Sequence, residues 1–344
     1  MIMRGLYLTD VGKLELRETP VPELSAGMVR IRVHRAGICA TDLGYWKNGS
    51  PKLRLPVILG HEVSGVIEET ADDVRQFRAG DRVIVTNDYH LCGRCRYCLG
   101  GAENMCVERR SIGSAENGAF ADYMVVPARM VLPLPDALSF EEGALAEVIA
   151  CGVHVLRCQA PVSPGDVVLV MGPGIMGVTA ALAAKAMGCK VIVAGLHRDA
   201  ARLQMALKLG IDRVVDLENE DLAAELDAIS DHYGADVTID GTGSARALET
   251  CLQLTAKRGT VVQLAAPGRG SSIDLSPIMM KELRYVGSYA KVRGDWELAL
   301  QWMASGKLSC RPLISELVAL EDYEKAFQTV ASATAFKIMF RLCD

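Results

Sequence analysis

Apolar and polar positions alternate in short runs over the first 135 or so residues of the chain. Examples are residues 28–33, 65–67 and 81–85, and Gly, Pro and Asp stand between such runs. A period of two is typical of strands with one buried face, and these intervening residue types favour turns. The pattern therefore predicts an all-β, barrel-like first domain.

The pattern changes near Ser139. Ser139 and Glu142 have the spacing of a capping box, which predicts a helix that continues to about Arg157. Near-continuous apolar runs then alternate with helical segments. We expect strands at 167–171, 190–194, 213–216, 236–240 and 260–264, and helices at 178–187, 199–209, 222–233 and 245–254. Strands of this kind alternating with helices predict a parallel sheet covered on both faces, an α/β fold.

Length and charge narrow the class of protein. The chain has 344 residues, half of them apolar, which is enough for two domains with separate cores. A net charge of −5 argues against partners such as nucleic acid or an anionic membrane. The charged N-terminus lacks the apolar stretch of a signal peptide, and the uncharged run 167–184 is interrupted by Gly172 and Gly174. We therefore expect a cytoplasmic protein, with this run forming a strand, a turn and a helix.

A glycine-rich loop lies between the expected strand 167–171 and the helix that follows it. Its residues are Gly172, Pro173, Gly174, Ile175, Met176 and Gly177, which match the pattern G-x-G-x-x-G. In this pattern the first glycine makes the turn, the second lets the backbone approach a pyrophosphate, and the third lets helix and strand pack closely. The sequence therefore predicts a dinucleotide site, and a glycine turn that binds nothing is the alternative.

The end of the next strand bears on the choice of dinucleotide. Enzymes that use NAD commonly carry an acidic residue there, which binds the ribose hydroxyls. This chain has Gly195 at that position, and Arg198 follows three residues later. The missing carboxylate and the nearby cation favour NADP slightly. NAD bound without the usual carboxylate, with Arg198 in solvent, remains the alternative.

Four cysteines, Cys92, Cys95, Cys98 and Cys106, lie within fifteen residues. This spacing is typical of a closed, tetrahedral structural zinc site. An iron–sulfur cluster begins with the same spacing, but the gap of seven residues and the missing proline after Cys106 depart from the ferredoxin pattern. The overall acidic charge disfavours a zinc knuckle that binds nucleic acid.

The chain contains 11 cysteines in all. An odd number without a secretory signal argues for a reducing compartment rather than a disulfide scaffold. Beyond the four clustered cysteines and Cys39, we expect the remaining six to be small buried apolar residues. These six are Cys151, Cys158, Cys189, Cys251, Cys310 and Cys343.

A second set of possible metal ligands is scattered: Cys39, His61, Glu62 and Glu147. Taken singly, such residues are commonly a buried thiol, a solvated imidazole or a helix carboxylate. The spacing alone does not bring them together. Their role therefore depends on what the chain resembles as a whole.

The chain resembles the zinc-dependent medium-chain alcohol and polyol dehydrogenases, and within them the sorbitol and threonine dehydrogenase branch. The landmarks that match, in order, are residues 37–42 (Gly-Ile-Cys-Ala-Thr-Asp), 60–65 (Gly-His-Glu-Val-Ser-Gly), the four cysteines, the glycine loop, and Lys281-Glu282-Leu283 with Gly287-Ser288. The resemblance implies a GroES-like β-barrel catalytic domain formed by residues 1–150 and 291–344, with the zinc lobe at 92–106. It also implies a Rossmann domain, a doubly wound parallel sheet, at 151–290.

The resemblance further implies a catalytic zinc ion held by Cys39, His61 and Glu62, with Glu147 as a fourth or exchanging ligand. Two zinc ions per chain would follow, one catalytic and one structural. Such a zinc ion lowers the pKa of a substrate hydroxyl, and the resulting alkoxide transfers a hydride to the nicotinamide. Thr41 is placed to take the hydroxyl proton. Asp42 would either orient His61 or cap the following helix.

Three positions bear on the proton route and on the substrate pocket. Gly44 stands where many relatives have a histidine, so the proton route beyond Thr41 is open. Tyr45 and Trp46 match sorbitol-type relatives, and we expect them to line the substrate pocket, with core packing as the alternative.

The leading hypothesis is an oxidoreductase that transfers a hydride between a secondary alcohol or polyol and NAD(P). L-Threonine 3-dehydrogenase is one alternative, and a non-catalytic protein that binds zinc and a dinucleotide is another. The resemblance also implies a homodimer or homotetramer, with no nucleic-acid or membrane partner.

Overall fold

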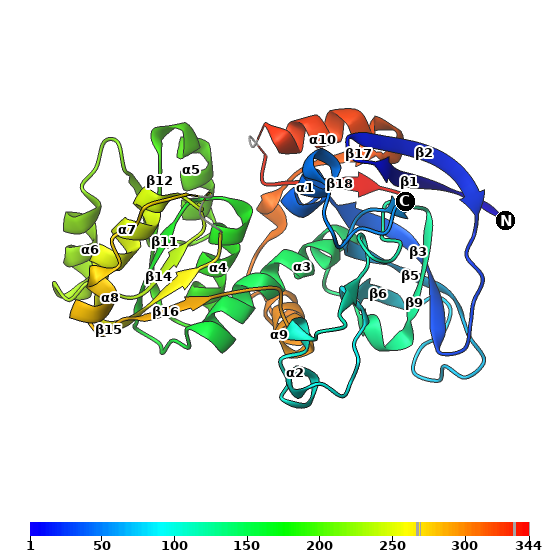
Figure 1. The fold of residues 1–344 in the computed structure, drawn as a ribbon, viewed down its shortest axis with the longest axis horizontal. Coiled ribbons are helices and arrows are strands. Elements are labelled where there is room, and N and C mark those ends of the chain that lie inside the picture. Colours follow the sequence, from blue (N-terminus) through cyan, green and yellow to red (C-terminus); the bar gives the residue numbers. More distant parts are fainter. Residues whose placement is uncertain (266–267, 269, 333–334, 344) are drawn as a thin grey trace. The chain divides into compact units, whose positions relative to one another are not determined.

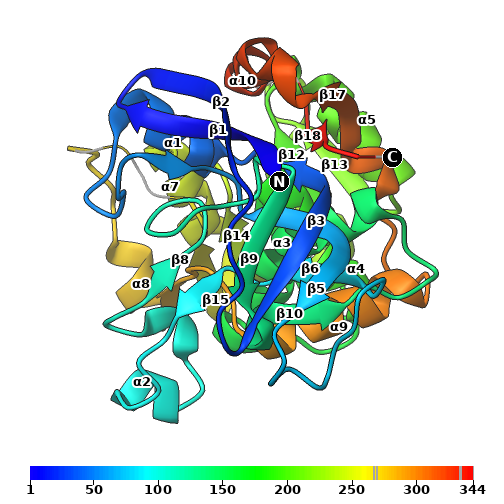
Figure 2. The same cartoon turned by 90° about the vertical axis from the view of Figure 1, so that its right-hand side faces the viewer.

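The structure, a computed structural model, describes residues 1–265, 268, 270–332 and 335–343. The chain divides into two compact units, shown as a ribbon in Figures 1 and 2. Unit 1 consists of Met1–Glu147, Val292–Leu300 and Leu313–Asp344, and unit 2 of Val148–Lys291 and Gln301–Pro312. The chain therefore leaves unit 1, forms most of unit 2, and returns to unit 1 for its last strands.

Unit 1 is mostly β-structure, as its alternating pattern predicts. Its strands are β1 (Ile2–Asp10), β2 (Lys13–Pro20), β3 (Met28–Gly37), β4 (Val57–Ile58), β5 (Glu62–Thr70), β6 (Arg82–Val85), β7 (Asp88–His90), β8 (Arg110–Ser111), β9 (Tyr123–Pro127), β10 (Val131–Pro133), β17 (Ile314–Ala319) and β18 (Lys337–Arg341). Its helices include α1 (Ala40–Asn48), α2 (Arg96–Leu99) and α10 (Tyr323–Ala331), while α3 (Phe140–His154) and α9 (Arg293–Ala304) continue into unit 2.

The strands of unit 1 form three sheets. The largest has the order β10-β6-β5-β3-β18-β17, with β9 also pairing with β3, and the other two are β2-β1-β4 and β7-β8. Figure 2 shows β3 among β5, β6 and β9. The C-terminal strand β18 runs antiparallel to β3, with Met339 opposite Gly37. The end of the chain thus lies beside the strand that leads to Cys39.

The expected barrel is not closed by hydrogen bonds among the described residues. The β1 sheet is connected to the segment before β9 by the bridge Gly5–Ala121, with backbone hydrogen bonds from Leu6 N to Phe120 O at 2.8 Å and from Asp122 N to Arg4 O at 3.1 Å. The barrel expectation is therefore corrected to separate sheets that share one core. That core contains Leu6 from β1 and Ile31 from β3, so apolar packing rather than a continuous ladder joins the sheets.

Unit 2 contains the expected parallel sheet, with the order β13-β12-β11-β14-β15-β16. Its strands are β11 (Val167–Met171), β12 (Lys190–Gly195), β13 (Arg213–Asp216), β14 (Ala235–Asp240), β15 (Thr255–Gln263) and β16 (Arg284–Gly287). Its helices are α4 (Ile175–Ala186), α5 (Ala200–Lys208), α6 (Leu222–Ser230), α7 (Ala245–Leu254) and α8 (Ser276–Met280).

The strand order of unit 2 reverses between β11 and β14, which is the arrangement of a doubly wound sheet. Right-handed crossovers put α4 and α5 on one face and α6 and α7 on the other (Figure 1). Leu226 of α6 and Leu248 of α7 share a buried core with Leu169 of β11. Ligands of such sheets bind at the carboxyl ends of the strands beside the reversal, which is where the glycine loop follows β11.

Two local expectations near the boundary of the units are confirmed. Ser139 and Glu142 form the capping box: Ser139 N donates to Glu142 Oε2 at 3.0 Å, and Glu142 N donates to Ser139 Oγ at 3.2 Å. The uncharged run 167–184 forms β11, the glycine turn and α4. Within the residues that the structure describes, no helix is long and apolar enough to cross a membrane.

All eleven cysteines lie in the described part of the chain, and none forms a disulfide. Of the six expected to be buried, Cys189, Cys251 and Cys310 are buried, whereas Cys151 and Cys343 are half-buried. The expectation is wrong for Cys158, which is exposed. It lies in a π-helical turn, Val155–Gln159, that extends α3 and presents its last three residues toward solvent.

His34 in β3 is a buried imidazole in the core of unit 1. Its ring stacks on Phe140 at a centroid distance of 4.0 Å, and neither ring nitrogen has a hydrogen-bond partner among the described residues. Burial and the nearby cations Arg32, Arg35 and Arg82 lower the pKa of His34 to about 4. An unfolded histidine titrates near 6.5, so the unfolded chain binds a proton between these two values that the folded protein does not. His34 therefore destabilises the fold as the pH decreases from about 6.5 to about 4.

We expect His34→Phe, which keeps the ring stack but cannot be protonated, to reduce this pH dependence. Between pH 7 and pH 5 the wild type should lose about 2 kcal/mol of unfolding free energy more than the variant, as measured by urea unfolding at both values. His232→Gln serves as the control because the His232 side chain is 82% exposed. Equal losses in the wild type and His34→Phe would contradict the prediction.

Candidate functional sites

Cys39 lies at the start of α1, directly after β3. Its backbone N donates to Asp42 Oδ2 at 2.9 Å, so Asp42 caps the helix from within its first turn. Asp42 is completely buried, and its other oxygen, Oδ1, accepts from Gly60 N at 3.2 Å. One carboxylate thus connects the loop of Cys39 with the loop that leads to His61 and Glu62.

Asp42 also contacts the imidazole of His61, with Oδ1 lying 3.5 Å from Nδ1. Burial lowers the pKa of His61, but the Asp42 carboxylate and, to a smaller extent, Cys39 outweigh this effect and hold that pKa well above its ordinary value. An imidazole held by a carboxylate at Nδ1 can coordinate a metal ion through Nε2. Asp42 therefore has both of the roles considered for it: it caps the helix, and it is the partner of His61.

Three of the scattered residues come together in space. The ligand atoms of Cys39, His61 and Glu62 all lie within 4.8 Å of one another. The antiparallel pairing of β3 with β5 brings them together, because Gly37 lies opposite Glu62. A thiol, an imidazole and a carboxylate in this proximity are a donor set that suits zinc.

Glu62 has one partnered and one unpartnered oxygen. It is completely buried, and Oε1 accepts from Lys337 Nζ at 2.5 Å. Oε2 has no hydrogen-bond partner among the described residues, and a Cβ on Gly37 would lie only 2.0 Å from it. Glycine at position 37 therefore leaves room for this oxygen. A buried carboxylate oxygen without a partner is costly, and a cation coordinated by it would remove that cost. The residues present thus fit a metal ion.

Lys337 of β18 is a residue of this cluster that sequence reasoning missed. Its side chain is 2% exposed, and Nζ also donates to Ile38 O at 3.2 Å. Burial lowers the pKa of Lys337, but the Glu62 carboxylate outweighs this effect and raises that pKa above its usual value. Lys337 is therefore a buried cation paired with Glu62. No motif contains it, and the only signal in the sequence is a lysine at the start of an apolar strand.

Glu147 and Thr41 lie near this cluster but are not part of the group of three. Glu147 is buried in α3, and its Oε1 accepts from Asn87 Nδ2 at 2.8 Å. Its carboxylate raises the pKa of Glu62, an effect smaller than those of burial and of Lys337. Thr41 is exposed, and its Oγ1 lies 3.6 Å from Cys39 Sγ. Metal ligation by Glu147 and proton transfer by Thr41 stay predictions.

Tyr45 and Trp46 of α1 pack against the core of unit 1. The Trp46 ring meets the Phe327 ring edge-on, with centroids 5.6 Å apart. This geometry agrees with core packing, the alternative considered for both residues. Their role in lining a substrate pocket stays a prediction.

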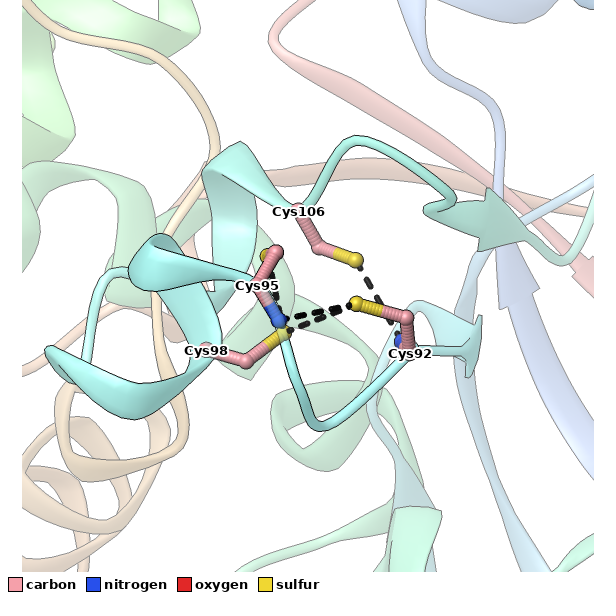
Figure 3. Close-up of side chains that lie close together, drawn as sticks. All are labelled: Cys92, Cys95, Cys98 and Cys106. Carbon is pink, nitrogen blue, oxygen red and sulfur yellow. Dashed lines mark hydrogen bonds between the residues drawn. The ribbon is translucent and has the colours of Figure 1, made fainter.

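The four clustered cysteines form a second group, shown in Figure 3. Their sulfur atoms all lie within 4.8 Å of one another, with Cys95 and Cys98 at 3.6 Å and Cys92 and Cys98 at 3.9 Å. A tetrahedral zinc ion with Zn–S bonds of about 2.3 Å requires sulfur separations of about 3.8 Å. Two backbone N–H groups, of Cys92 and Cys95, donate to the sulfurs of Cys106 and Cys92 at 3.4 Å. The group therefore fits one tetrahedral ion.

The glycine loop of unit 2 has the geometry that its pattern predicts. Gly172 has a φ of +98°, and its N–H donates to Ala194 O at 2.8 Å. Gly174 is the N-cap of α4, and no atom lies within 4 Å of where its Cβ would be. A Cβ on Gly177 would lie 2.1 Å from Gly172 O. The loop thus leaves the start of α4, at Ile175 and Met176, open to a phosphate.

The end of β12 is more acidic than its own sequence indicates. Gly195 pairs with Asp216 of β13, and Asp216 Oδ2 lies 2.8 Å from Nδ1 of His197. Glu218 Oε2 accepts from His197 N at 2.6 Å. Arg198 is exposed and makes no ion pair within the described part of the chain. Sequence reasoning missed both carboxylates because they lie at the end of the neighbouring strand β13 rather than of β12 itself.

Comparisons with known proteins agree with both parts of the chain. Residues 25–136 match the model of the alcohol dehydrogenase GroES-like domain, and residues 176–305 match that of zinc-binding dehydrogenases. The chain belongs to the zinc-dependent medium-chain dehydrogenase family. This dehydrogenase is therefore an oxidoreductase, as its sequence motifs predict.

Relatives match this dehydrogenase over nearly its whole length. It is 34% identical to D-arabitol-phosphate dehydrogenase of Enterococcus avium, over 93% of this chain and 91% of that protein. It is 32% identical to sorbitol dehydrogenase of Halalkalibacterium halodurans, over 99% of this chain and 100% of that protein. Among solved structures, a zinc-binding dehydrogenase of Sinorhizobium meliloti bound to NADP superposes with a TM-score of 0.91 at 28% identity, covering 99% of each chain.

The geometry of the four sulfurs predicts that Cys98→Ser protein of this dehydrogenase will contain about one zinc ion less per chain, because a closed site with three thiolates binds zinc less tightly. Metal analysis after dialysis would measure the difference. Cys189→Ser is a matched control, since its thiol is buried in unit 2 and donates only to Ser163 O. Unchanged zinc content in Cys98→Ser would contradict the prediction.

Proposed function

We propose that the protein oxidises a secondary hydroxyl of a polyol or polyol derivative to a ketone, using zinc and NAD(P). The observation that carries the proposal is the group of Cys39, His61 and Glu62, in which Glu62 is buried and its free Oε2 lies at the space that Gly37 leaves. The glycine loop supplies a place for a dinucleotide. Two of the relatives act, by name, on sorbitol and on arabitol phosphate, which supports a polyol as the substrate.

In this proposal Cys39, His61 and Glu62 hold the catalytic zinc, and Glu147 is the additional carboxylate nearby. Cys92, Cys95, Cys98 and Cys106 hold a structural ion. Zinc held by the first group would act as a Lewis acid on the substrate hydroxyl, and the nicotinamide would accept the hydride. We place the catalytic domain at residues 1–150 and 291–344 and the dinucleotide domain at 151–290.

The residues of the chain would orient the reactants and move the proton. Asp42 fixes His61 and the helix start of Cys39 together, so that both ligand atoms keep their positions. Thr41 would accept the hydroxyl proton at Oγ1. Because Thr41 is exposed and Gly44 has no side chain, water is the next acceptor. Tyr45 and Trp46 would form the wall of the pocket from α1.

The cofactor preference depends on the end of β12. Gly195 and Arg198 favour a 2′-phosphate, as the sequence suggests, but the carboxylates of Asp216 and Glu218 lie at the same strand end. Glu218 already occupies the backbone N–H of His197, a donor that a 2′-phosphate would use. Asp216 is paired with His197, but the Glu218 carboxylate makes no such pair among the described residues and repels a phosphate, whereas it can accept from a ribose hydroxyl. We therefore propose NAD as the preferred cofactor, with Glu218 in place of the missing acidic residue of β12.

We also propose that the enzyme is a cytoplasmic homodimer or homotetramer. The strand β16 supports association, because it forms one edge of the parallel sheet of unit 2 and its residues are largely exposed. Exposed sheet edges are surfaces on which chains pair.

Absorbance at 340 nm tests the proposed reaction. We expect reduction of NAD or NADP with at least one member of a panel of polyols, polyol phosphates and secondary alcohols, with threonine included for the rival activity. Cys39→Ser should lower kcat/KM by about 100-fold or more, because it removes a zinc ligand. Cys189→Ser is the control, because it removes a buried thiol of unit 2 that is not among the proposed zinc ligands. No reduction on the whole panel, or full activity of Cys39→Ser, would overturn the proposal and favour a binding protein.

The cofactor assignment predicts that Glu218→Gln shifts the ratio of kcat/KM values for NADP and NAD toward NADP by about tenfold. The reason is the loss of one repulsive charge beside the 2′-phosphate, worth about 1.4 kcal/mol. Glu282→Gln is the control, since the Glu282 side chain is 80% exposed and paired only loosely with Arg258 at 3.9 Å. A wild-type preference for NADP that Glu218→Gln leaves unchanged would contradict the assignment.

A further inference from the structure

We infer that Lys337 is a positioning residue that assembles the catalytic metal cluster before the metal binds, by holding Glu62 and the loop of Cys39 in one geometry. This inference rests on the proposed assignment of Cys39, His61 and Glu62 as zinc ligands. It concerns how the ligands are held, which the family motifs do not address. No motif noted in the sequence includes Lys337.

The contacts of Lys337 connect two of the three ligand segments. Its Nζ donates to Glu62 Oε1 at 2.5 Å and to Ile38 O at 3.2 Å, and Ile38 directly precedes Cys39. The backbone of β18 also holds the segment before Cys39, since Ile38 N donates to Ile338 O at 3.0 Å. A single ammonium group therefore fixes the carboxylate of one ligand and the backbone beside another.

The hydrogen bond from Lys337 also determines which oxygen of Glu62 is available to a metal ion. With Oε1 engaged by Lys337, only Oε2 is left without a partner. Rotation of the carboxylate would break the bond to Lys337 and leave a buried cation unpaired, which is strongly unfavourable. Lys337 thus presents Glu62 as a ligand with one oxygen, in an orientation that exists without the metal.

Lys337 also balances charge at this cluster, in which Glu62 is buried and Cys39 and His61 are half-buried. Three groups carry negative charge when the site is formed: the Cys39 thiolate, Glu62 and Glu147. Zinc and Lys337 together carry an equal positive charge. Burial of Lys337, at 2% exposure, keeps this charge from being screened by water. Without the lysine, the negative charge of the complete site would exceed the positive charge of zinc by one.

Zinc affinity tests the inference with the metal alone as the probe. Lys337→Met removes the ammonium group and keeps the chain length, and Lys337→Arg keeps the charge. Competition with a chromophoric chelator would measure the dissociation constant of the weaker zinc site. Lys325→Met in α10 is the control, because the Lys325 side chain is 75% exposed and lies 3.8 Å from Glu316.

We expect Lys337→Met to weaken zinc binding at the Cys39 cluster by about 10- to 100-fold, the effect of losing a group that orients a ligand. Binding to the four cysteines should not change, and Lys337→Arg should recover most of the affinity. Cobalt loaded into the Cys39 cluster should show an altered visible spectrum in Lys337→Met. Zinc affinity within twofold of the wild type would overturn the inference.

A double-mutant cycle with Glu62→Gln separates positioning from general stability. If Lys337 acts through Glu62, Lys337→Met should have little further effect on zinc affinity in the Glu62→Gln background. The double variant also removes both buried charges, so it remains folded if the single variant does not. An equal loss of affinity in both backgrounds would overturn the inference. These measurements do not depend on turnover, so a protein without dehydrogenase activity would refute the proposed function and leave this inference open to its own test.

Discussion

The antiparallel pairing of β3 with β5 is the constraint on which the chemistry of unit 1 depends. It places Gly37 opposite Glu62, so that Cys39, two residues further along the chain, lies beside His61 and Glu62. A shift by one residue would turn Glu62 to the other face of the sheet and separate the three ligand atoms. The buried carboxylate of Asp42 supports this register, because it bonds to the backbone on both sides of the pair.

How much of the site could be predicted depended on how local its parts are. The four cysteines and the glycine loop are short segments whose spacing already implies their shape, and both have the geometry that the spacing indicates. Cys39, His61 and Glu62 required the pairing of two strands, so only the family resemblance could connect them. Lys337 and Glu218 were not identified from the sequence because each contacts a residue of another strand or strand end. The pattern of apolar and polar residues along a chain carries no information on which strands are neighbours.

In the fold, too, the elements set by local sequence could be predicted, whereas the features that depend on distant strands could not. Strands and helices of unit 2 follow from their apolar runs, because a strand buried on both faces differs in pattern from an amphipathic helix. The barrel-like first domain is mostly β-structure as expected, but it does not close among the described residues, since closure depends on hydrogen bonds between strands far apart in the chain. Strand β1 and the segment before β9 share the bridge Gly5–Ala121 and a few backbone hydrogen bonds beside it, and the common apolar core provides the remaining connection.

The position of Lys337 on the last strand has a consequence for the order of assembly. The four cysteines are complete once residue 106 has been made, so they can bind an ion early during synthesis. Cys39, His61 and Glu62 precede them in the chain, yet their buried cation arrives only with β18. In the proposed assignment, a growing chain therefore contains all four cysteines of the structural site long before it contains the cation that pairs with Glu62. In the proposed assignment, the last strand completes the surroundings of Glu62, because its Lys337 is the buried cation that pairs with this carboxylate.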